Sequence, residues 1–435
     1  MSVVTLQFGQ CGNQLGEELF DRLFSEAAAA RPALAGAIRR LYFREASAST
    51  ARRGLYTARA VLVDTEPRVV QRCLQGAEDD GGERPVRGWS YHGAGSVYRQ
   101  GGAANNWACG FNVHGPAVAE QVLATLRREV ERCDRLGGLL ALHSVAVGTG
   151  SGLGSHLLQV TRDAYPAVPL ASVSIWPFEG GEVSVQCYNA ALSLASLYET
   201  VDLAVVCENE RYLELCRLSL GEPKPSLASI NAAICGNLVR TLLPSLRSSL
   251  GVDSCPLLRL SGHLCAHPLY RLATLKALPQ VAHGTEAFTS DGWAGLQRRL
   301  VQLVESGGTV DRPSAASGAS QGPCRVVAAS AFLWGQGAAE ASLDPLRKLP
   351  VWRQALDPLQ VHSDPHQVGG LERSIGFVSN CQAVLPTLQT AATRATGMMR
   401  ASAYMHQYER YGLSRDDMSE ALLSLLQVQN DYERL

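Results

Sequence analysis

The sequence predicts an α/β protein with a doubly wound parallel-sheet nucleotide-binding domain, a second α/β domain and C-terminal helices. Three observations lead to this fold class. Short β-type runs alternate with helical patterns through the first half, which implies a parallel sheet covered by helices on both faces. Glycine, amide or carboxylate residues follow three of these runs, at the sheet edge where such folds bind ligands. The 435 residues are two to three times the ~150 residues of one domain.

The first half of the chain supplies the strands and helices of the predicted nucleotide-binding domain, residues 1–210. β-branched, aromatic and aliphatic runs predict strands, and apolar residues at intervals of three or four predict amphipathic helices. The predicted strands are residues 3–8, 58–63, 139–147, 170–175 and 203–207. The predicted helices begin near Leu15 and Leu153 and also cover residues 118–133 and 188–198. We expect the glycine-rich residues 148–152 to form a loop.

The second half is less regular. Pro223 and Pro225 precede a helical pattern over residues 227–243, and residues 306–323 form a Gly/Ser/Ala/Pro-rich loop. Residues 326–333 read as a strand within the expected second domain, residues 211–380. Two helical patterns, residues 383–411 and 415–432, predict a C-terminal helical segment over residues 381–435.

Composition excludes several classes of protein. Lys and Arg number 39 against 40 Asp and Glu, a formal net charge of -1, which argues against a strongly basic nucleic-acid binder. No run approaches the ~18 to 20 apolar residues of a membrane span, and the N-terminus has no charged leader before an apolar block. The 12 cysteines are scattered without CxxC or zinc-type spacing, which suggests thiols in a reducing compartment. We therefore expect a cytoplasmic protein.

The stretch GTGSGLGS, residues 148–155, lies between a predicted strand and a predicted helix. Backbone N–H groups at such a junction, added to a helix N-terminus, can cradle an anion. It is not a P-loop, because no lysine follows, and it does not fit G-x-G-x-x-G, because Leu153 stands where the third glycine belongs. Taken alone, a turn of this kind can equally be purely structural.

Three more motifs accompany this turn: GQCGNQ at residues 9–14, DTEP at 64–67 and NNWACG at 105–110. Together the four motifs resemble those of the tubulin/FtsZ family of GTP-binding cytoskeletal proteins, and within it the delta-tubulin branch. The resemblance covers nearly the whole chain. It is strong over residues 1–210 and after residue 371 and weak between them. It implies a tubulin-like fold and a site for GTP or GDP with Mg²⁺.

The resemblance also assigns roles to particular residues. The implied phosphate contacts are Gln10, Cys11, Asn105, Ser144, Gly148, Thr149, Gly150, Ser151 and Gly152. Asp64 and Glu66 match the acidic pair that holds a Mg²⁺-bound water. Glu182 matches an acidic residue that contacts the ribose, and Asn209 and Asn231 match the two asparagines whose amides contact guanine. Carboxylate oxygens suit Mg²⁺, and an amide offers guanine both a donor and an acceptor.

Each of these residue types also has an ordinary structural explanation. Asp64 and Glu66 could simply be the acidic start of a helix, Glu182 a solvated loop carboxylate, and the asparagines capping or turn residues. Cys11 could be a nucleophile, but no His or Asp partner stands near it in the sequence.

Three positions depart from the family pattern. Val147 and Ala104 replace glycines of the two phosphate loops, and a side chain at a position that needs positive φ costs about 1–3 kcal/mol. Leu227 stands where the family commonly has an aromatic ring on the base, whose loss costs about 1 kcal/mol of stacking. We still expect GTP binding, because most other contacts remain.

The sequence lacks several features by which polymerising members of the family hydrolyse GTP and contact their neighbours in the lattice. Polymerising tubulins insert an acidic residue towards the nucleotide of the next subunit, where it positions water; here Arg259 falls at that position, and only Asp253 nearby is acidic. Residues 282–291, which resemble the lateral-contact loop of microtubules, are short and lack its basic and aromatic character. The printed sequence ends NDYERL without a polyacidic tail. These features argue against a bulk microtubule subunit.

Two hypotheses from different classes follow. In the first, the chain is a specialised tubulin that binds guanine nucleotide, with weak or absent GTPase activity, and helps build triplet microtubules in centrioles, basal bodies or cilia. Its partners would be other tubulins and centriolar proteins, in heterodimers or homo-oligomers, with no nucleic acid or membrane. In the second, it is a self-activated GTPase that switches assembly of a polymer. A dinucleotide-dependent oxidoreductase ranks third, because its third glycine is missing.

The mapping of Leu227 can be tested by restoring an aromatic ring. Leu227→Tyr should tighten GTP binding several-fold, because the ring gains about 1 kcal/mol of stacking on the guanine. Titration with a fluorescent GTP analogue measures the change. Equal affinity of the two proteins would mean that this residue does not face the base.

Overall fold

A computed structural model describes residues 1–46, 55–75, 88–181, 183–245, 255–281, 292–310, 323–353 and 357–435. Glu182, Asp253, the segment 282–291 and most of 306–323, which the sequence singled out, lie outside these ranges.

A ten-stranded sheet runs through the described part of the chain, in the order β12-β11-β13-β10-β9-β8-β7-β1-β4-β6. The strands from β6 to β10 are all parallel, whereas β13 runs antiparallel to both β10 and β11. The strands are β1 (Ser2–Phe8), β4 (Ala60–Asp64), β6 (Ser96–Tyr98), β7 (Leu136–Ser144), β8 (Leu170–Trp176), β9 (Leu203–Glu208), β10 (Leu272–Leu278), β11 (Val326–Gly335), β12 (Leu359–Asp364) and β13 (Arg373–Cys381). A smaller sheet joins β2 (Phe43–Glu45), β3 (Tyr56–Ala58) and β5 (Trp89–Ser90).

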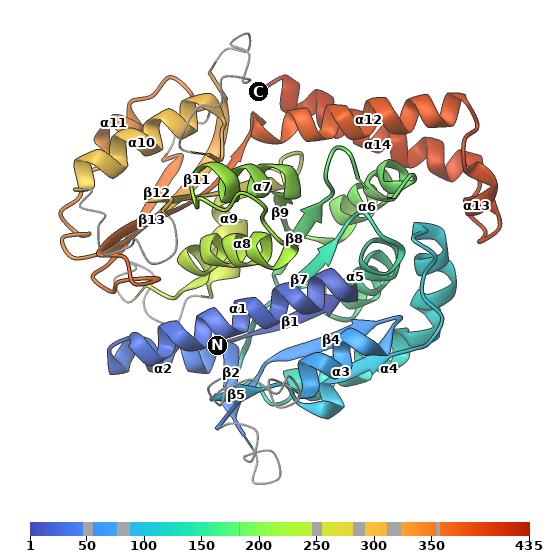
Figure 1. Ribbon diagram of the computed structural model, residues 1–435, viewed down its shortest axis with the longest axis horizontal. Coiled ribbons are helices and arrows are strands. Elements are labelled where there is room, and N and C mark those ends of the chain that lie inside the picture. The colour runs from blue at the N-terminus through green and yellow to red at the C-terminus, as the bar shows by residue number, and fades with distance from the viewer. Residues whose placement is uncertain are drawn as a thin grey trace.

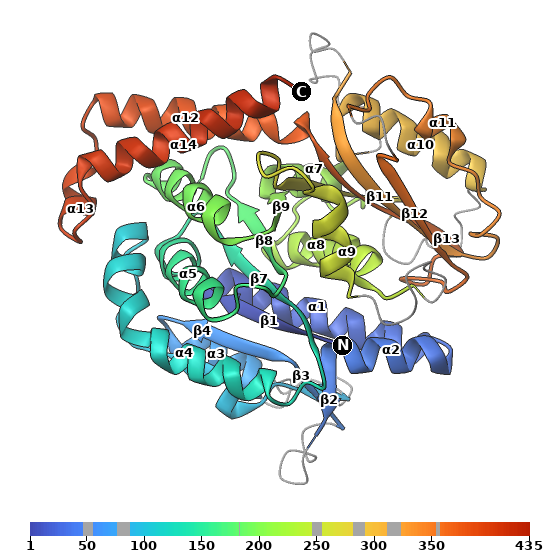
Figure 2. The ribbon, with the colours of Figure 1, turned by 180° about the vertical axis from the view of Figure 1, so that it is seen from behind.

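Helices cover both faces of the large sheet (Figures 1 and 2). One apolar core lies between the sheet and the helices α1 (Gly9–Ala29), α2 (Pro32–Tyr42), α3 (Pro67–Gln75), α7 (Asn209–Leu218), α8 (Leu227–Leu242) and α9 (Pro256–Leu264). The opposite face is covered by α4 (Gly115–Val130), α5 (Gly154–Ala164) and α6 (Gln186–Thr200). On the β10–β13 half, a third core packs beneath α10 (Trp293–Ser306) and α11 (Asp344–Arg347).

The C-terminal helices form an outer layer. The helices α12 (Leu385–Arg400) and α14 (Arg415–Glu433) pack on α6 and on each other, and the short α13 (Met405–Glu409) lies at their outer end (Figure 1). Because α6 is covered from both sides, all of its first nine residues are buried. The predicted fold class, a doubly wound α/β protein with C-terminal helices, is confirmed.

Three predicted element boundaries were wrong. The strand predicted over residues 58–63 is split at Arg59. Its N–H donates to the carbonyl of Tyr42, the last residue of α2, and its carbonyl accepts from the N–H of Thr5 in the large sheet, at 2.9 Å each. The strand predicted over residues 139–147 ends at Ser144. The helix predicted over residues 383–411 stops at Arg400, because Ser402 and Tyr404 adopt left-handed conformations with φ of 52° and 61°.

None of the 12 cysteines, all of which lie within the described ranges, is in a disulfide, and most are buried. In the described ranges, no helix is both long enough and apolar enough to cross a bilayer.

Candidate functional site

The parallel strands bring their carboxyl ends to one edge of the sheet. Because β4, β1, β7, β8 and β9 are neighbours in parallel register, the residues that follow them share that edge. These are the positions that the sequence singled out: Gln10 after β1, Asp64 at the end of β4, Ser144 at the end of β7 and Asn209 after β9.

The glycine-rich residues 148–152, predicted to be a loop, are helical. The chain leaves β7 at Ser144, whose Oγ accepts the N–H of Ala146 at 3.2 Å, and enters a helix at Gly148 that continues into α5. The first helical hydrogen bond runs from the N–H of Ser151 to the carbonyl of Val147 at 2.9 Å. The N–H groups before Ser151 are therefore those of a helix N-terminus, where an anion is favourably bound.

The glycines in this turn allow backbone to pack against backbone. A Cβ on Gly150 would lie 2.7 Å from the carbonyl oxygen of Ser144, and one on Gly152 would lie 2.0 Å from that of Trp107. Neither distance is compatible with a side chain. The small residues are thus needed to seat the helix start against the sheet and the neighbouring loop, before any ligand is considered.

The hydroxyl groups of the turn point in different directions. Ser151 is fully buried and its Oγ donates back to the carbonyl of Val147 at 2.6 Å. Thr149 Oγ1 instead lies 2.6 Å from Thr65 Oγ1, so it joins the turn to the residue that follows Asp64. Two motifs that are 84 residues apart in the sequence are held together by this bond.

The start of α1 lies directly beside the turn. Gly9 has a φ of +71°, and a Cβ there would be 3.2 Å from the nitrogen of Gly150. Gln10, which follows, is exposed, and Cys11 is partly exposed. Desolvation by the surrounding protein nevertheless raises the pKa of the Cys11 thiol to about 12. The thiol is therefore protonated near neutral pH, which argues against a nucleophilic role.

The acidic pair has one buried and one exposed member. Asp64 is only 5% exposed, and its Oδ1 accepts the N–H of Glu66 at 3.2 Å. Burial raises the pKa of Asp64 to about 6, partly opposed by hydrogen bonds from Glu66, Thr65 and Asn13. Glu66 is exposed.

The donor set at this edge fits a phosphate-bound cation better than a metal held by protein alone. Among the described residues no group of three or more His, Cys, Asp and Glu could hold a metal ion. Mg²⁺ is commonly bound by one or two carboxylates together with water and phosphate oxygens. Asp64 and Glu66 supply two such carboxylates beside a helix N-terminus that suits phosphate.

The loop that carries Asn105 is conformationally strained. Ala104 and Asn105 have φ values of 50° and 52°, in the left-handed region that favours glycine. Of the two glycine replacements noted in the sequence, Ala104 therefore does occupy a glycine-type conformation. Val147 does not appear among the residues with positive φ. The cost at Ala104 is about 1 kcal/mol.

The residues assigned to the base lie on the helices α7 and α8. Asn209 is the first residue of α7, two strands away from β7, and Asn231 lies in α8; both are partly exposed. Leu227, the first residue of α8, is 59% exposed. Glu182, the predicted ribose contact, lies outside the described residues. The structure thus gathers the phosphate and magnesium candidates tightly and leaves the base candidates on two neighbouring helices.

Arg259 is not at the surface, where its alignment with the hydrolysis element would put it. It is 7% exposed in α9, with its guanidinium 5.2 Å from the ring centre of Phe332. Its neighbour Leu258, 52% exposed, faces outward instead. Burial beneath β11 lowers the pKa of Arg259.

Several residues of this site were not anticipated from the sequence. His143 is fully buried beneath the turn, with Nδ1 3.0 Å from the carbonyl oxygen of Gly150 and Nε2 2.8 Å from Ser172 Oγ. Asn13 donates to the carbonyls of Gly9 and Val63 at 2.9 and 3.3 Å. The signal that could have identified them in the sequence is a polar residue within an apolar periodic segment, because a buried polar group needs a hydrogen-bond partner.

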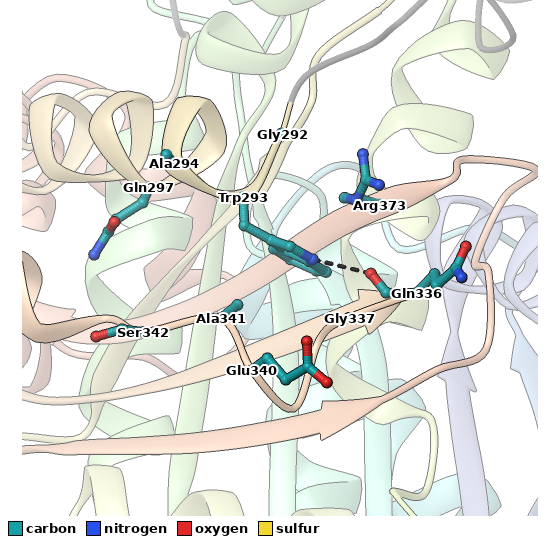
Figure 3. A pocket seen from close by; sticks show the side chains of 10 residues that line it. All are labelled: Gly292, Trp293, Ala294, Gln297, Gln336, Gly337, Glu340, Ala341, Ser342 and Arg373. Carbon is teal, nitrogen blue, oxygen red and sulfur yellow. Dashed lines mark hydrogen bonds between the residues drawn. The ribbon is translucent and has the colours of Figure 1, made fainter.

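A pocket lies away from this edge. About 660 Å³ in volume, it is bordered by the start of α10 and the chain that follows β11. Figure 3 shows the indole of Trp293 in it, with Nε1 donating to the carbonyl of Gln336 at 3.0 Å, and Glu340 and Arg373 at its sides. It contains none of the residues that the sequence assigned to a nucleotide.

The fold and this edge define a parallel-sheet nucleotide-binding protein of one particular class: the chain belongs to the tubulin/FtsZ family. The model of the Tubulin/FtsZ family GTPase domain matches residues 2–217, and family membership implies binding of GTP or GDP. The chain is similar along its whole length to tubulin delta chains. That of Macaca fascicularis is 31% identical and that of Homo sapiens 30%, with 99% of each chain covered. The tubulin beta chain of Aspergillus fumigatus is 27% identical, over 99% of this chain and 94% of the relative.

The buried His143 should make the stability of the fold depend on pH. Burial lowers the pKa of His143 from 6.5 to about 4, so the unfolded chain binds this proton more readily than the folded one. The stabilisation is complete above pH 6.5 and is lost as pH falls towards 4, by at most about 3.5 kcal/mol at about 1.4 kcal/mol per pKa unit. Urea unfolding midpoints measured from pH 4 to 7.5 should fall less steeply in His143→Gln than in the parent. Parallel profiles of the two proteins would contradict this role.

Proposed function

We propose that this chain is a specialised tubulin that binds GTP or GDP with Mg²⁺ at the carboxyl edge of its parallel strands. The observation that carries the proposal is the hydrogen bond of 2.6 Å between Thr65 and Thr149. It joins the acidic motif to the start of the α5 helix, so that a cation-binding pair and an anion-binding helix N-terminus lie side by side. A magnesium nucleotide needs both.

Each candidate residue has a role in this proposal. The N–H groups around Gly148, Thr149 and Gly150, with Gln10, Cys11 and Asn105, would contact phosphates. Asp64 and Glu66 would hold Mg²⁺ or its water, and the ion when bound would neutralise phosphate charge. Glu182 would contact the ribose, and Asn209 and Asn231 the guanine. Ser144, Ser151 and Gly152 would support the turn from behind, since the serine hydroxyls bond to backbone and Gly152 packs on Trp107.

Weak or absent GTP hydrolysis is part of the proposal. Phosphoryl transfer to water needs a group that orients or deprotonates the water. The helix α9, which aligns with the element that supplies this group to a neighbouring subunit, contains no Asp or Glu. Its Arg259 is buried against Phe332, and its most exposed side chain, Leu258, is apolar.

We further propose that the protein is a structural or regulatory component of centrioles and basal bodies, with a role in cilia, and not a bulk microtubule subunit. Similarity over the full length to tubulin delta chains supports a specialised role. The apolar Leu258 on the surface of α9, and the absence of acidic residues from this helix, support a contact surface different from that of a polymerising subunit. Other tubulins and centriolar proteins are the expected partners, in heterodimers or homo-oligomers.

The second candidate is a GTPase whose own hydrolysis switches assembly of a polymer. The nearly complete set of phosphate and magnesium candidates favours it. The two candidates differ in turnover: a structural tubulin would hold its nucleotide with negligible phosphate release, whereas a self-activated GTPase would release phosphate faster as protein concentration rises.

The nucleotide content of freshly purified protein tests the site and the turnover together. Denaturation followed by ion-exchange chromatography should yield close to one guanine nucleotide per chain, mainly GTP. Asp64→Asn should lower this content, because it removes the buried carboxylate at the cation position, whereas Asp344→Asn on the distant α11 should not. An empty parent protein that also fails to bind added GTP would refute the site. Phosphate release that grows with protein concentration would favour the second candidate.

Cellular placement tests the proposed role. A tagged chain expressed in ciliated cells should concentrate at centrioles and basal bodies. Fluorescence microscopy beside a centriolar marker and a microtubule marker measures the distribution. Uniform incorporation along cytoplasmic microtubules would show that the chain is a bulk subunit after all.

A further inference from the structure

The connection between α12 and α14 is bonded to the nucleotide edge. Its residues 403–411, which we call the C-terminal clasp, include α13 and lie at the outer end of the two helices (Figure 1). Asn106 Nδ2 donates to the carbonyl of Gln407 at 3.2 Å, and Asn112 Nδ2 to that of Tyr411 at 2.8 Å. Both asparagines come from the segment that follows Asn105.

Asn189, at the start of α6, is the centre of these contacts. It is fully buried, and its amide makes four hydrogen bonds. Its Nδ2 donates to the carbonyls of Asn105 at 2.9 Å and Ala146 at 2.7 Å. Its Oδ1 accepts from the N–H of Trp107 at 3.0 Å and from the hydroxyl of Tyr408 at 2.7 Å. Every donor and acceptor of the side chain is used, so its orientation is fixed.

Three of these bonds hold the two loops that carry the phosphate candidates. Asn105 and Trp107 belong to one loop, and Ala146 lies just before Gly148 in the other. Ala104, next to Asn105, has a left-handed φ of 50°, which an alanine adopts only when its surroundings impose it. Asn189 contributes to that constraint, because it ties the adjacent Asn105 to the β7–α5 turn.

The fourth bond connects this arrangement to the clasp. Tyr408 is fully buried, and its ring packs edge-on against Tyr188, with centroids 5.5 Å apart at 88°. The hydroxyl of Tyr188 in turn donates to the carbonyl of Ala403 at 3.3 Å. The clasp is therefore anchored on the two consecutive residues of α6, Tyr188 and Asn189, that stand beside the loops.

We propose that Asn189 is a positioning residue for the two phosphate loops, and that its bond to Tyr408 couples nucleotide binding to docking of the C-terminal clasp. The inference rests on the proposed nucleotide site. A nucleotide that orders the loops strengthens the hold of Asn189 on Tyr408. By linkage, a docked clasp raises nucleotide affinity by the same factor. A partner that moves α12 or α14 would thereby alter nucleotide retention without touching the site.

The chain offers a matched control for the test. On α14, the hydroxyl of Tyr432 donates to Asn380 Oδ1 at 2.8 Å and accepts from the N–H of Leu272 at 2.9 Å, and the residue is fully buried. This is also a buried Tyr–Asn bond between the C-terminal helices and the body of the protein. It lies at β10 and β13, away from both phosphate loops.

The experiment compares Tyr408→Phe, Tyr432→Phe and the full-length parent by GTP titration, thermal unfolding and hydrogen exchange of residues 403–411 with and without GTP. Loss of one buried hydrogen bond should weaken GTP binding about 3- to 10-fold in Tyr408→Phe. In the parent, GTP should slow exchange in the clasp, and in Tyr408→Phe this protection should largely vanish. Tyr432→Phe, which removes the buried bonds to Asn380 and Leu272, should lose at least as much thermal stability as Tyr408→Phe and keep its GTP affinity within twofold.

A second variant isolates the donor side of Asn189. Asn189→Asp keeps the shape and the two acceptor contacts but removes the donors to Asn105 and Ala146, so it should lose more GTP affinity than Tyr408→Phe. The coupling would be overturned if both substitutions lowered thermal stability but left GTP affinity and hydrogen exchange of the clasp at parental values. The bond between Asn189 and Tyr408 would then be purely structural. A parent protein that binds no GTP would instead refute the nucleotide site itself, and the first titration detects that outcome.

Discussion

Close packing of backbone against backbone at the β7–α5 turn is the constraint on which the rest of the site depends. The carbonyl of Ser144 and that of Trp107 approach Gly150 and Gly152 so closely that no side chain could stand between them. Because the turn is seated in this way, the N-terminus of the helix faces the edge where β1 and β4 also end. His143 supports the turn from below through the carbonyl of Gly150, and Thr149 joins it to the acidic motif through Thr65.

The C-terminal helices extend this arrangement into a third layer. They cover α6, whose start carries the buried Asn189, so a single side chain is in contact with two loops and with the clasp. A buried amide is costly unless all its hydrogen bonds are made. If one of its hydrogen-bond partners moved away, the amide of Asn189 would lose a bond, so the positions of the two loops and the clasp depend on one another. This dependence is the physical basis for coupling between the nucleotide edge and the helices α12 and α14.

The departures from the family pattern fall into two physical kinds. Ala104 keeps a glycine-type backbone conformation, and the strain is held by neighbouring hydrogen bonds. Arg259 has instead left the surface: its guanidinium stacks on Phe332, and an apolar residue faces outward in its place. The first kind affects the free energy of loop ordering, whereas the second changes what the α9 surface can offer a neighbouring subunit.

The sequence by itself determined the fold class, the family and the edge at which the candidate residues gather, because strand–helix alternation and short motifs are local features. It placed Gln10, Asp64 and Ser144 at the carboxyl ends of strands correctly, since parallel strands share one carboxyl edge. Only the tertiary structure decided that residues 148–152 are helical, that Arg259 is buried and that Asn189 joins two loops to Tyr408. Those outcomes depend on contacts between residues tens to hundreds of positions apart, for which periodicity and motif spacing carry no signal.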